Sequence, residues 1–135
     1  MAMGAVMAAE QRLGFDPHDV SALKCGYDVE SRIPAEGRLR FVEVKGRANG
    51  ATTVTVTKNE ILTALNQPEA FYLAIVEVDG DSVGEPHYVR RPFHKEPDFG
   101  ATSVTYSLRE LMRSGRDSAE RTSSEDPMDK SGASA

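Results

Sequence analysis

The chain has 135 residues, of which 39% are hydrophobic, and a formal net charge of −5. This length suits one domain, and its one cysteine, Cys25, cannot form an internal disulfide or hold a zinc ion by itself. The sequence contains neither the ~20-residue apolar run of a membrane span nor a recognisable secretory signal, so we expect a cytoplasmic protein.

The first half of the chain predicts a helix followed by a β-hairpin. Apolar residues at helical spacing indicate a helix over residues 5–13, which Gly14 would end. Residues 16–19 have the composition of a turn. Residues 26–33 and 39–45 each alternate apolar with polar side chains, and a short turn-forming segment separates them. We therefore expect these two strands to pair as a hairpin.

The next elements are a β-branched strand, a capped helix and an apolar strand. Residues 52–57 (TTVTVT) predict a third strand. Thr57 and Glu60 have the spacing of a capping box, which predicts a helix that ends before Pro68. Residues 71–78 (FYLAIVEV) are nearly all apolar, as expected of a strand that is covered on both faces.

The remaining residues predict smaller elements and a tail. Residues 87–91 suit an edge strand, and Ser107 begins a second capping box and a short last helix. Residues 114–135 are rich in serine and acidic, without Val, Ile, Leu or aromatic residues, so we expect a disordered tail behind a domain over residues 1–113. The order α-β-β-β-α-β indicates a mixed α/β class, α+β-like, with a mixed sheet flanked by helices.

Residues of the predicted hairpin suit phosphodiester hydrolysis. Strand alternation places Glu43 and Lys45 on one face, roughly 7 Å apart, and Asp28 on the polar face of the neighbouring strand. Two such carboxylates can hold Mg²⁺ or Mn²⁺, and the carbonyl of Val44 can add an oxygen ligand. The lysine can orient a water and neutralise charge on a phosphoryl oxygen. Glu10 would join this site if the first helix packs on the hairpin.

These residues also have an ordinary interpretation. Glu43 and Lys45 can form a solvated ion pair worth ~0–1 kcal/mol, and Glu10 can be a surface glutamate. Basic side chains around the hairpin and in a later cluster, Arg47, Arg90 and Arg91 among them, suit phosphate contacts on an acidic protein. The same arginines can instead cover apolar surface with their stems.

The element order together with Asp28 and the Glu43–Lys45 pair resembles the restriction-endonuclease-like fold and its PD-(D/E)xK nuclease motif. Tyr27 stands where the motif's name has proline. More specifically, four segments look like the C-terminal domain of the plant protein NO VEIN. They are GYDVES (26–31), FVEVKGR (41–47), VTVTKNEILTAL (54–65) and FYLAIVEV (71–78), and the resemblance covers roughly residues 5–106.

The resemblance implies roles for individual residues. Asp28 and Glu43 match the metal-binding acids, Lys45 matches the motif lysine, and Glu10 matches an acid that some of these nucleases carry on their first helix. Lys58 and Asn59, with the glutamate that follows them, match a segment where accessory active-site residues can lie, and helix N-termini often receive anions. The implied cofactor is Mg²⁺ or Mn²⁺, and the implied partners are DNA and a helicase-type or restriction-type protein.

Two functions follow from these observations. The first is a metal-dependent deoxyribonuclease-like domain with Asp28, Glu43 and Lys45 at its centre. The second is a module that docks nucleic acid or a partner protein without catalysis. The acidic total charge favours the second, and neither the oligomeric state nor a substrate preference can be inferred from the residues.

Overall fold

The structure, a computed structural model, describes residues 1–113, so the tail predicted at 114–135 lies outside the described residues. A further helical segment covers residues 108–113. The other elements, in chain order, are α1 (Ala2–Arg12), β1 (Asp16–Asp19), η1 (Ser21–Leu23), β2 (Val29–Ile33), β3 (Arg38–Ala48), β4 (Thr53–Thr57), α2 (Lys58–Asn66), β5 (Phe71–Asp79), β6 (Ser82–Val83), β7 (His87–Arg90) and β8 (Ser103–Ser107).

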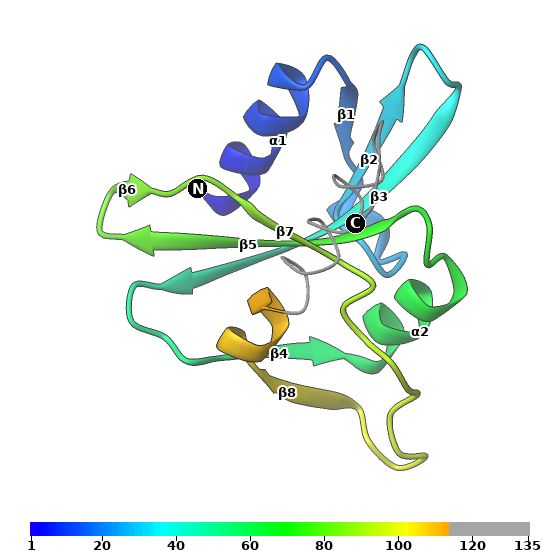
Figure 1. The fold of residues 1–135 in the computed structure, drawn as a ribbon, viewed down its shortest axis with the longest axis vertical. Coiled ribbons are helices and arrows are strands. Elements are labelled where there is room, and N and C mark those ends of the chain that lie inside the picture. Colours follow the sequence, from blue (N-terminus) through cyan, green and yellow to red (C-terminus); the bar gives the residue numbers. More distant parts are fainter. Residues whose placement is uncertain (114–135) are drawn as a thin grey trace, which may run out of the picture.

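A mixed sheet of six strands forms the centre of the molecule (Figure 1). Strands β1, β2 and β3 form an antiparallel meander, and β5 pairs parallel to β3. Strands β6 and β7 both pair antiparallel with β5. A parallel pair needs a crossover connection, which β4 and α2 supply. The fold therefore belongs to the predicted mixed α/β class, with helices flanking a mixed sheet.

Apolar side chains cover both faces of this sheet, and β5 contributes to both. Leu73 belongs to the same buried cluster as Ile61 of α2, whereas Ala74 belongs to the cluster of Val6 in α1. Figure 1 shows α1 on one side of the sheet and α2, β4 and β8 on the other. The prediction that residues 71–78 form a strand covered on both faces is therefore confirmed.

The third predicted strand does not belong to the central sheet. Residues 52–57 do form a strand, β4, but β4 pairs with β8 in a separate two-stranded sheet. The meander is completed by β1, although residues 16–19 have the composition of a turn. Pairing with β2 outweighs this local preference, and Pro17 is tolerated because β1 lies at the edge of the sheet.

Other boundaries also depend on tertiary contacts. Helix α1 begins at Ala2 rather than at residue 5, and β3 continues to Ala48, beyond the predicted end at residue 45. Cys25 is exposed, and its thiol donates to the carbonyl of Tyr27. Strand β7 occupies the sheet edge predicted at residues 87–91. Among the described residues, no helix is long and apolar enough to cross a membrane.

Candidate functional site

The start of α2 is fixed by the predicted capping box. The Thr57 hydroxyl accepts a hydrogen bond from the Glu60 N–H at 3.1 Å, and the Thr57 N–H donates to Glu60 Oε1 at 2.9 Å. These bonds satisfy two backbone donors that the first turn of a helix leaves free. They also hold the Glu60 carboxylate at the end of α2 that faces β3.

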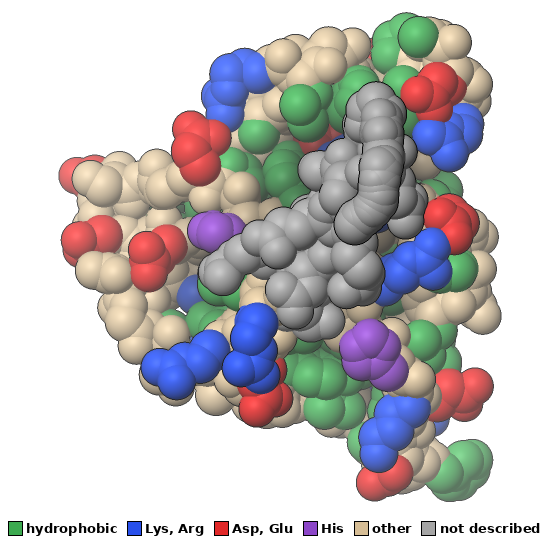
Figure 2. Space-filling model, viewed as in Figure 1, with side chains coloured by type: hydrophobic (Ala, Val, Ile, Leu, Met, Phe, Trp, Pro, Cys, Tyr) green, Lys and Arg blue, Asp and Glu red, His purple; other side chains and the backbone are tan. Residues whose placement is uncertain are grey.

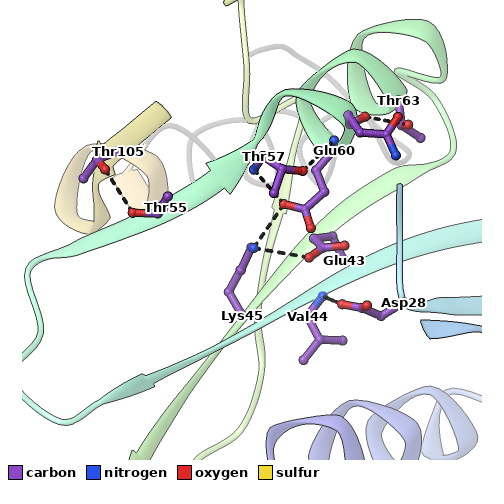
Figure 3. Close-up of polar contacts among 10 residues, drawn as sticks. Asp28, Glu43, Val44, Lys45, Thr55, Thr57, Glu60, Thr63 and Thr105 are labelled. Atoms are coloured by element: carbon purple, nitrogen blue, oxygen red, sulfur yellow. Dashed lines mark hydrogen bonds and ion pairs between the residues drawn. The ribbon is translucent and has the colours of Figure 1, made fainter. Parts of the chain in front are cut away.

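Glu43 and Lys45 project from β3 toward this carboxylate, as Figure 3 shows. Lys45 Nζ lies 3.4 Å from Glu43 Oε2 and 3.1 Å from Glu60 Oε1. The Glu43 residue is only 3% exposed, and the side chains of Lys45 and Glu60 are 18% and 17% exposed. Two carboxyl groups thus contact one ammonium in a largely buried position, which differs from the solvated ion pair of the ordinary interpretation.

Burial and the neighbouring carboxylates change the pKa of Glu43 most. Burial, the hydrogen bond and charge of Glu60, and the charge of Asp28 raise the pKa of Glu43 to about 9. Burial opposes the ionised form of Glu60 as well, but hydrogen bonds from Glu43 and a backbone N–H, together with Lys45, lower its pKa. At neutral pH, a protonated Glu43 therefore donates to an ionised Glu60 beside a charged Lys45.

Asp28 directly precedes β2 and reaches across to β3. Its Oδ2 accepts a hydrogen bond from the Val44 N–H at 2.9 Å, and its own N–H donates to the Val42 carbonyl at 2.9 Å. Within a strand the N–H and C=O of one residue point to the same side, so the Val44 carbonyl is directed toward Asp28 as well. Asp28, Glu43 and Val44, predicted from the sequence as neighbours, do lie together.

A pocket of about 270 Å³ opens at these carboxylates. Asp28 and Glu43 line it together with Glu60, Asn59 and Lys24. The predicted site thus has a concave surface that can receive a ligand group. The sequence did indicate Glu60 as a helix cap, but its ion pair with Lys45 depends on how α2 packs against β3.

Lys24 was not identified from the sequence. It follows η1 with a left-handed backbone, φ 55°, and this turn returns the chain toward the pocket. Gly26 allows the same segment to pack closely on α2, since a Cβ at Gly26 would lie 2.2 Å from Thr63 Oγ1. The only sequence feature near Lys24 is Gly26, which indicates a turn. A turn by itself does not show that Lys24 lines a pocket.

The donor set fits a hard divalent cation held by two carboxylates. Within residues 1–113, no three Asp, Glu, His or Cys side chains gather into a metal-binding group. Mg²⁺ commonly uses one or two carboxylates and completes its coordination with water and substrate oxygens. A cation would also favour the ionised form of Glu43, whose pKa is raised by burial and by the neighbouring carboxylates. Asp28, Glu43 and the Val44 carbonyl are therefore suitable ligands for Mg²⁺ or Mn²⁺.

Glu10 lies on the opposite face of the sheet, where it is fully buried. Its two oxygens accept hydrogen bonds from Arg40 Nε and Nη2, both at 2.9 Å, and from the Tyr88 hydroxyl at 2.7 Å. The Arg40 guanidinium in turn lies 3.9 Å from the centre of the Tyr72 ring. Glu10 thus connects α1 to the sheet, and the structure does not bring it to the pocket.

Three of the five predicted phosphate-contacting residues lie on elements that carry pocket residues, and one of the three lines the pocket. Arg47 follows Glu43 and Lys45 on the same face of β3, and its Nε donates to the Thr53 carbonyl at 2.9 Å. Asn59 lines the pocket. Lys58 begins α2, and its Nζ donates to the carbonyl of Phe99 at 3.2 Å.

The other two, Arg90 and Arg91, are not brought to the pocket. Arg90 lies over Tyr72 on the α1 face, 5.3 Å from the ring centre, and both arginines pair with Glu69. Over the described part of the surface in Figure 2, basic and acidic side chains are interspersed. A single basic face that includes all the predicted residues is therefore not formed by residues 1–113.

A comparison with known protein families matches the part of the chain that contains the candidate site. The family model for the C-terminal part of the protein NO VEIN matches residues 1–89, which are 89 of the 135 residues. The matched span includes all the pocket residues and ends within β7. No curated protein matches the chain. Since the match covers more than half of the sequence, the chain belongs to the NO VEIN C-terminal family.

Proposed function

We propose that this chain is a metal-dependent, nuclease-like domain of PD-(D/E)xK type that hydrolyses phosphodiester bonds in DNA. The observation that carries the proposal is the convergence of Asp28, Glu43 and Lys45 beside one pocket. In the central sheet and its two helices, the element order is α-β-β-β-α-β, which is the order on which the resemblance to the restriction-endonuclease-like fold rests. A cytoplasmic location and a helicase-type or restriction-type partner belong to the same proposal.

The ligands and the lysine have separate roles in this mechanism. Asp28, Glu43 and the Val44 carbonyl would hold Mg²⁺ or Mn²⁺, and such an ion activates water and neutralises phosphate charge. Lys45 remains protonated, because Glu60 and Glu43 outweigh the effect of burial and raise its pKa. Its ammonium therefore donates hydrogen bonds, which orient the attacking water and stabilise negative charge developing on the phosphate.

Glu60 acts through Lys45 rather than on the substrate. Its carboxylate lies 3.1 Å from Lys45 Nζ and is tied to the Thr57 N–H, so it connects the lysine to the end of α2. This support limits the positions that the long lysine side chain can take. Glu60 is thus a positioning residue for Lys45.

A cleavage assay in Mg²⁺ or Mn²⁺, on supercoiled plasmid and on a single-stranded oligonucleotide, tests the proposed activity. We expect Glu43→Gln and Lys45→Met to lower the rate by about 100-fold or more, because each removes a group that stabilises the transition state. Glu36→Gln is the matched control for Glu43→Gln, since Glu36 has the same charge but lies exposed, outside the pocket. Full activity in both site variants would contradict the mechanism.

Calorimetric titration of the two metals tests the ligand assignment without reference to turnover. Wild-type protein should bind Mn²⁺ and Mg²⁺, and Asp28→Asn should abolish binding while it retains an oxygen that can accept from the Val44 N–H. The Glu36→Gln protein should bind as the wild type does. If neither metal binds to the wild type, the assignment of Asp28 and Glu43 as ligands is wrong.

A non-catalytic docking module is the second candidate. It is favoured by the absence of a three-residue metal-binding group within residues 1–113 and by the neutralisation of Glu43 through a proton. This function predicts nucleic-acid binding that weakens with salt, needs no metal and survives Glu43→Gln. The cleavage assay separates it from the nuclease, because a docking module would show binding without any metal-dependent cleavage.

A further inference from the structure

The loop between β7 and β8 presents an aromatic ring to solvent. Phe99 is 97% exposed, more than any other large hydrophobic residue in the described chain. The loop, yellow in Figure 1, projects away from the sheet near the start of α2. A ring with almost all of its surface in water contributes nothing to the core, so its position has no explanation in the packing of the fold.

The backbone around Phe99 is nevertheless held in place. The Ala101 N–H donates to the Asp98 carbonyl at 2.9 Å, which closes a turn with Phe99 at one of its two central positions. Lys58 then contacts the loop twice. Its N–H donates to the Thr102 carbonyl at 2.9 Å, and its Nζ donates to the Phe99 carbonyl at 3.2 Å. The ring is therefore presented on an anchored turn.

The same lysine connects the ring to the candidate site. Lys58 Nζ lies 5.5 Å from the centre of the Phe99 ring, so an ammonium and an aromatic face are presented together. The next two residues, Asn59 and Glu60, line the pocket that contains Asp28. A positive charge beside an exposed ring is the combination with which proteins bind single-stranded nucleic acid, through the phosphate and the stacked base respectively.

We propose that Phe99 and Lys58 bind an unpaired base and its phosphate, so that the pocket acts on single-stranded nucleic acid or on unpaired ends. This inference rests on the proposed function, because it names the substrate class of the same site. Bases within a duplex are covered on both faces by their neighbours, whereas an unpaired base offers a face to Phe99. Glu96 and Asp98 in the same loop offset nearby positive charge and so weaken the attraction for phosphate. Stacking on Phe99 therefore has to supply most of the affinity for the nucleic acid.

Fluorescence can test this contact directly, because the chain contains no tryptophan. We expect the emission of a Phe99→Trp protein to be quenched by oligothymidylate in the presence of EDTA, which prevents metal-dependent cleavage. A blunt duplex and an abasic oligonucleotide of the same length should quench much less, since neither offers a free base. Leu13→Trp is the matched control, because Leu13 is 55% exposed at the end of α1 and should not respond to any of the three.

Affinity gives a second measurement on the unmodified ring. In anisotropy titrations with labelled oligothymidylate, Phe99→Ala should weaken binding by about 5- to 100-fold, the usual loss for one base–aromatic stack. Lys58→Gln should weaken it less and should reduce its salt dependence. Equal quenching by all three oligonucleotides, or unchanged affinity in Phe99→Ala, would overturn the inference.

Failure of this inference can be distinguished from failure of the nuclease proposal. If the wild type binds oligothymidylate through Phe99 but never cleaves DNA in Mg²⁺ or Mn²⁺, the base-binding element stands and the nuclease proposal is wrong. If it cleaves blunt duplex at a rate that Phe99→Ala leaves unchanged, the nuclease proposal stands and the base-binding element is wrong. Glu43→Gln should abolish cleavage and preserve the Phe99-dependent binding.

Discussion

Glu43 makes folding stability sensitive to pH. Its pKa in the folded chain is about 9, against an ordinary value of 4.5 that applies when the chain unfolds. Between these values the unfolded state has lost a proton that the folded state retains. The stabilisation is therefore complete below about pH 4.5 and is lost as pH rises toward 9. We expect wild-type stability to fall over this range by at most about 1.4 kcal/mol per pH unit.

Urea unfolding between pH 5 and 9 measures this effect when Glu43→Gln is compared with the wild type. The variant should show a flatter profile and should be the more stable protein near pH 8, because Gln cannot lose a proton. Glu36→Gln, at an exposed turn, should follow the wild-type profile. Mg²⁺ should stabilise the wild type and flatten its profile if Glu43 is a ligand. Parallel profiles for Glu43→Gln and the wild type would contradict the raised pKa.

The buried pair of Glu10 and Arg40 is expected to be structural. Arg40→Met leaves the Glu10 carboxylate without its two guanidinium hydrogen bonds, in a position with no exposure. Removing one partner of such a pair should cost about 3–5 kcal/mol in the free energy of unfolding. The double variant Glu10→Gln/Arg40→Met should recover part of this loss, because no unpaired charge remains. Denaturant unfolding measures these free energies. If the loss in the double variant equals the sum of the losses in the two single variants, the coupling is disproved.

At the scale of elements, the contact between the η1–β2 segment and α2 keeps the pocket closed on one side. Gly26→Ala should be strongly destabilising, because φ is +94° and the new Cβ would lie 2.2 Å from Thr63 Oγ1. Gly37→Ala is the matched control, since Gly37 has φ +68° but a Cβ added there would meet no atom within 4 Å. Gly37→Ala should lower the free energy of unfolding by about 1–2 kcal/mol, the cost of a side chain on a left-handed backbone.

Thermal unfolding of the two alanine variants measures the difference. Adding Thr63→Ala to Gly26→Ala should recover the stability lost through the contact of the new Cβ with the Thr63 hydroxyl. The cost of the positive φ at residue 26 should remain. Equal losses at Gly26 and Gly37 would show that the chain relaxes around the contact and that α2 does not fix this segment.

The elements also show what could be predicted from the sequence. Alternation correctly placed Glu43 and Lys45 on one face of β3, because period two is a local property of a strand. The partner of a strand is not local. Residues 52–57 pair with β8, some 50 residues away, and residues 16–19, with the composition of a turn, form β1 of the central sheet. The placement of Glu10 at the pocket is wrong because it also depends on a non-local contact. Helical spacing does not reveal which face of a sheet a helix covers.

At the scale of the whole molecule, the folded unit extends beyond the family match. The match ends at residue 89, but the cluster on the α2 face also contains Phe93, Leu108 and Leu111, each less than 10% exposed. Strand β4 likewise has its partner, β8, outside the matched span. The crossover that sets α2 against β3, and thus Glu60 against Lys45, therefore rests on residues that follow the match.

This dependence predicts how the chain responds to truncation. A chain of residues 1–113 should unfold cooperatively with a midpoint near that of the full chain, because it keeps both clusters. A chain of residues 1–90 should lose cooperative unfolding, since β4 would be an unpaired edge and the α2 face would expose Val54, Val56 and Ile61. Circular dichroism during urea titration distinguishes the two. A cooperative transition in the shorter chain would mean that the six-stranded sheet holds α2, and with it the pocket, without β8.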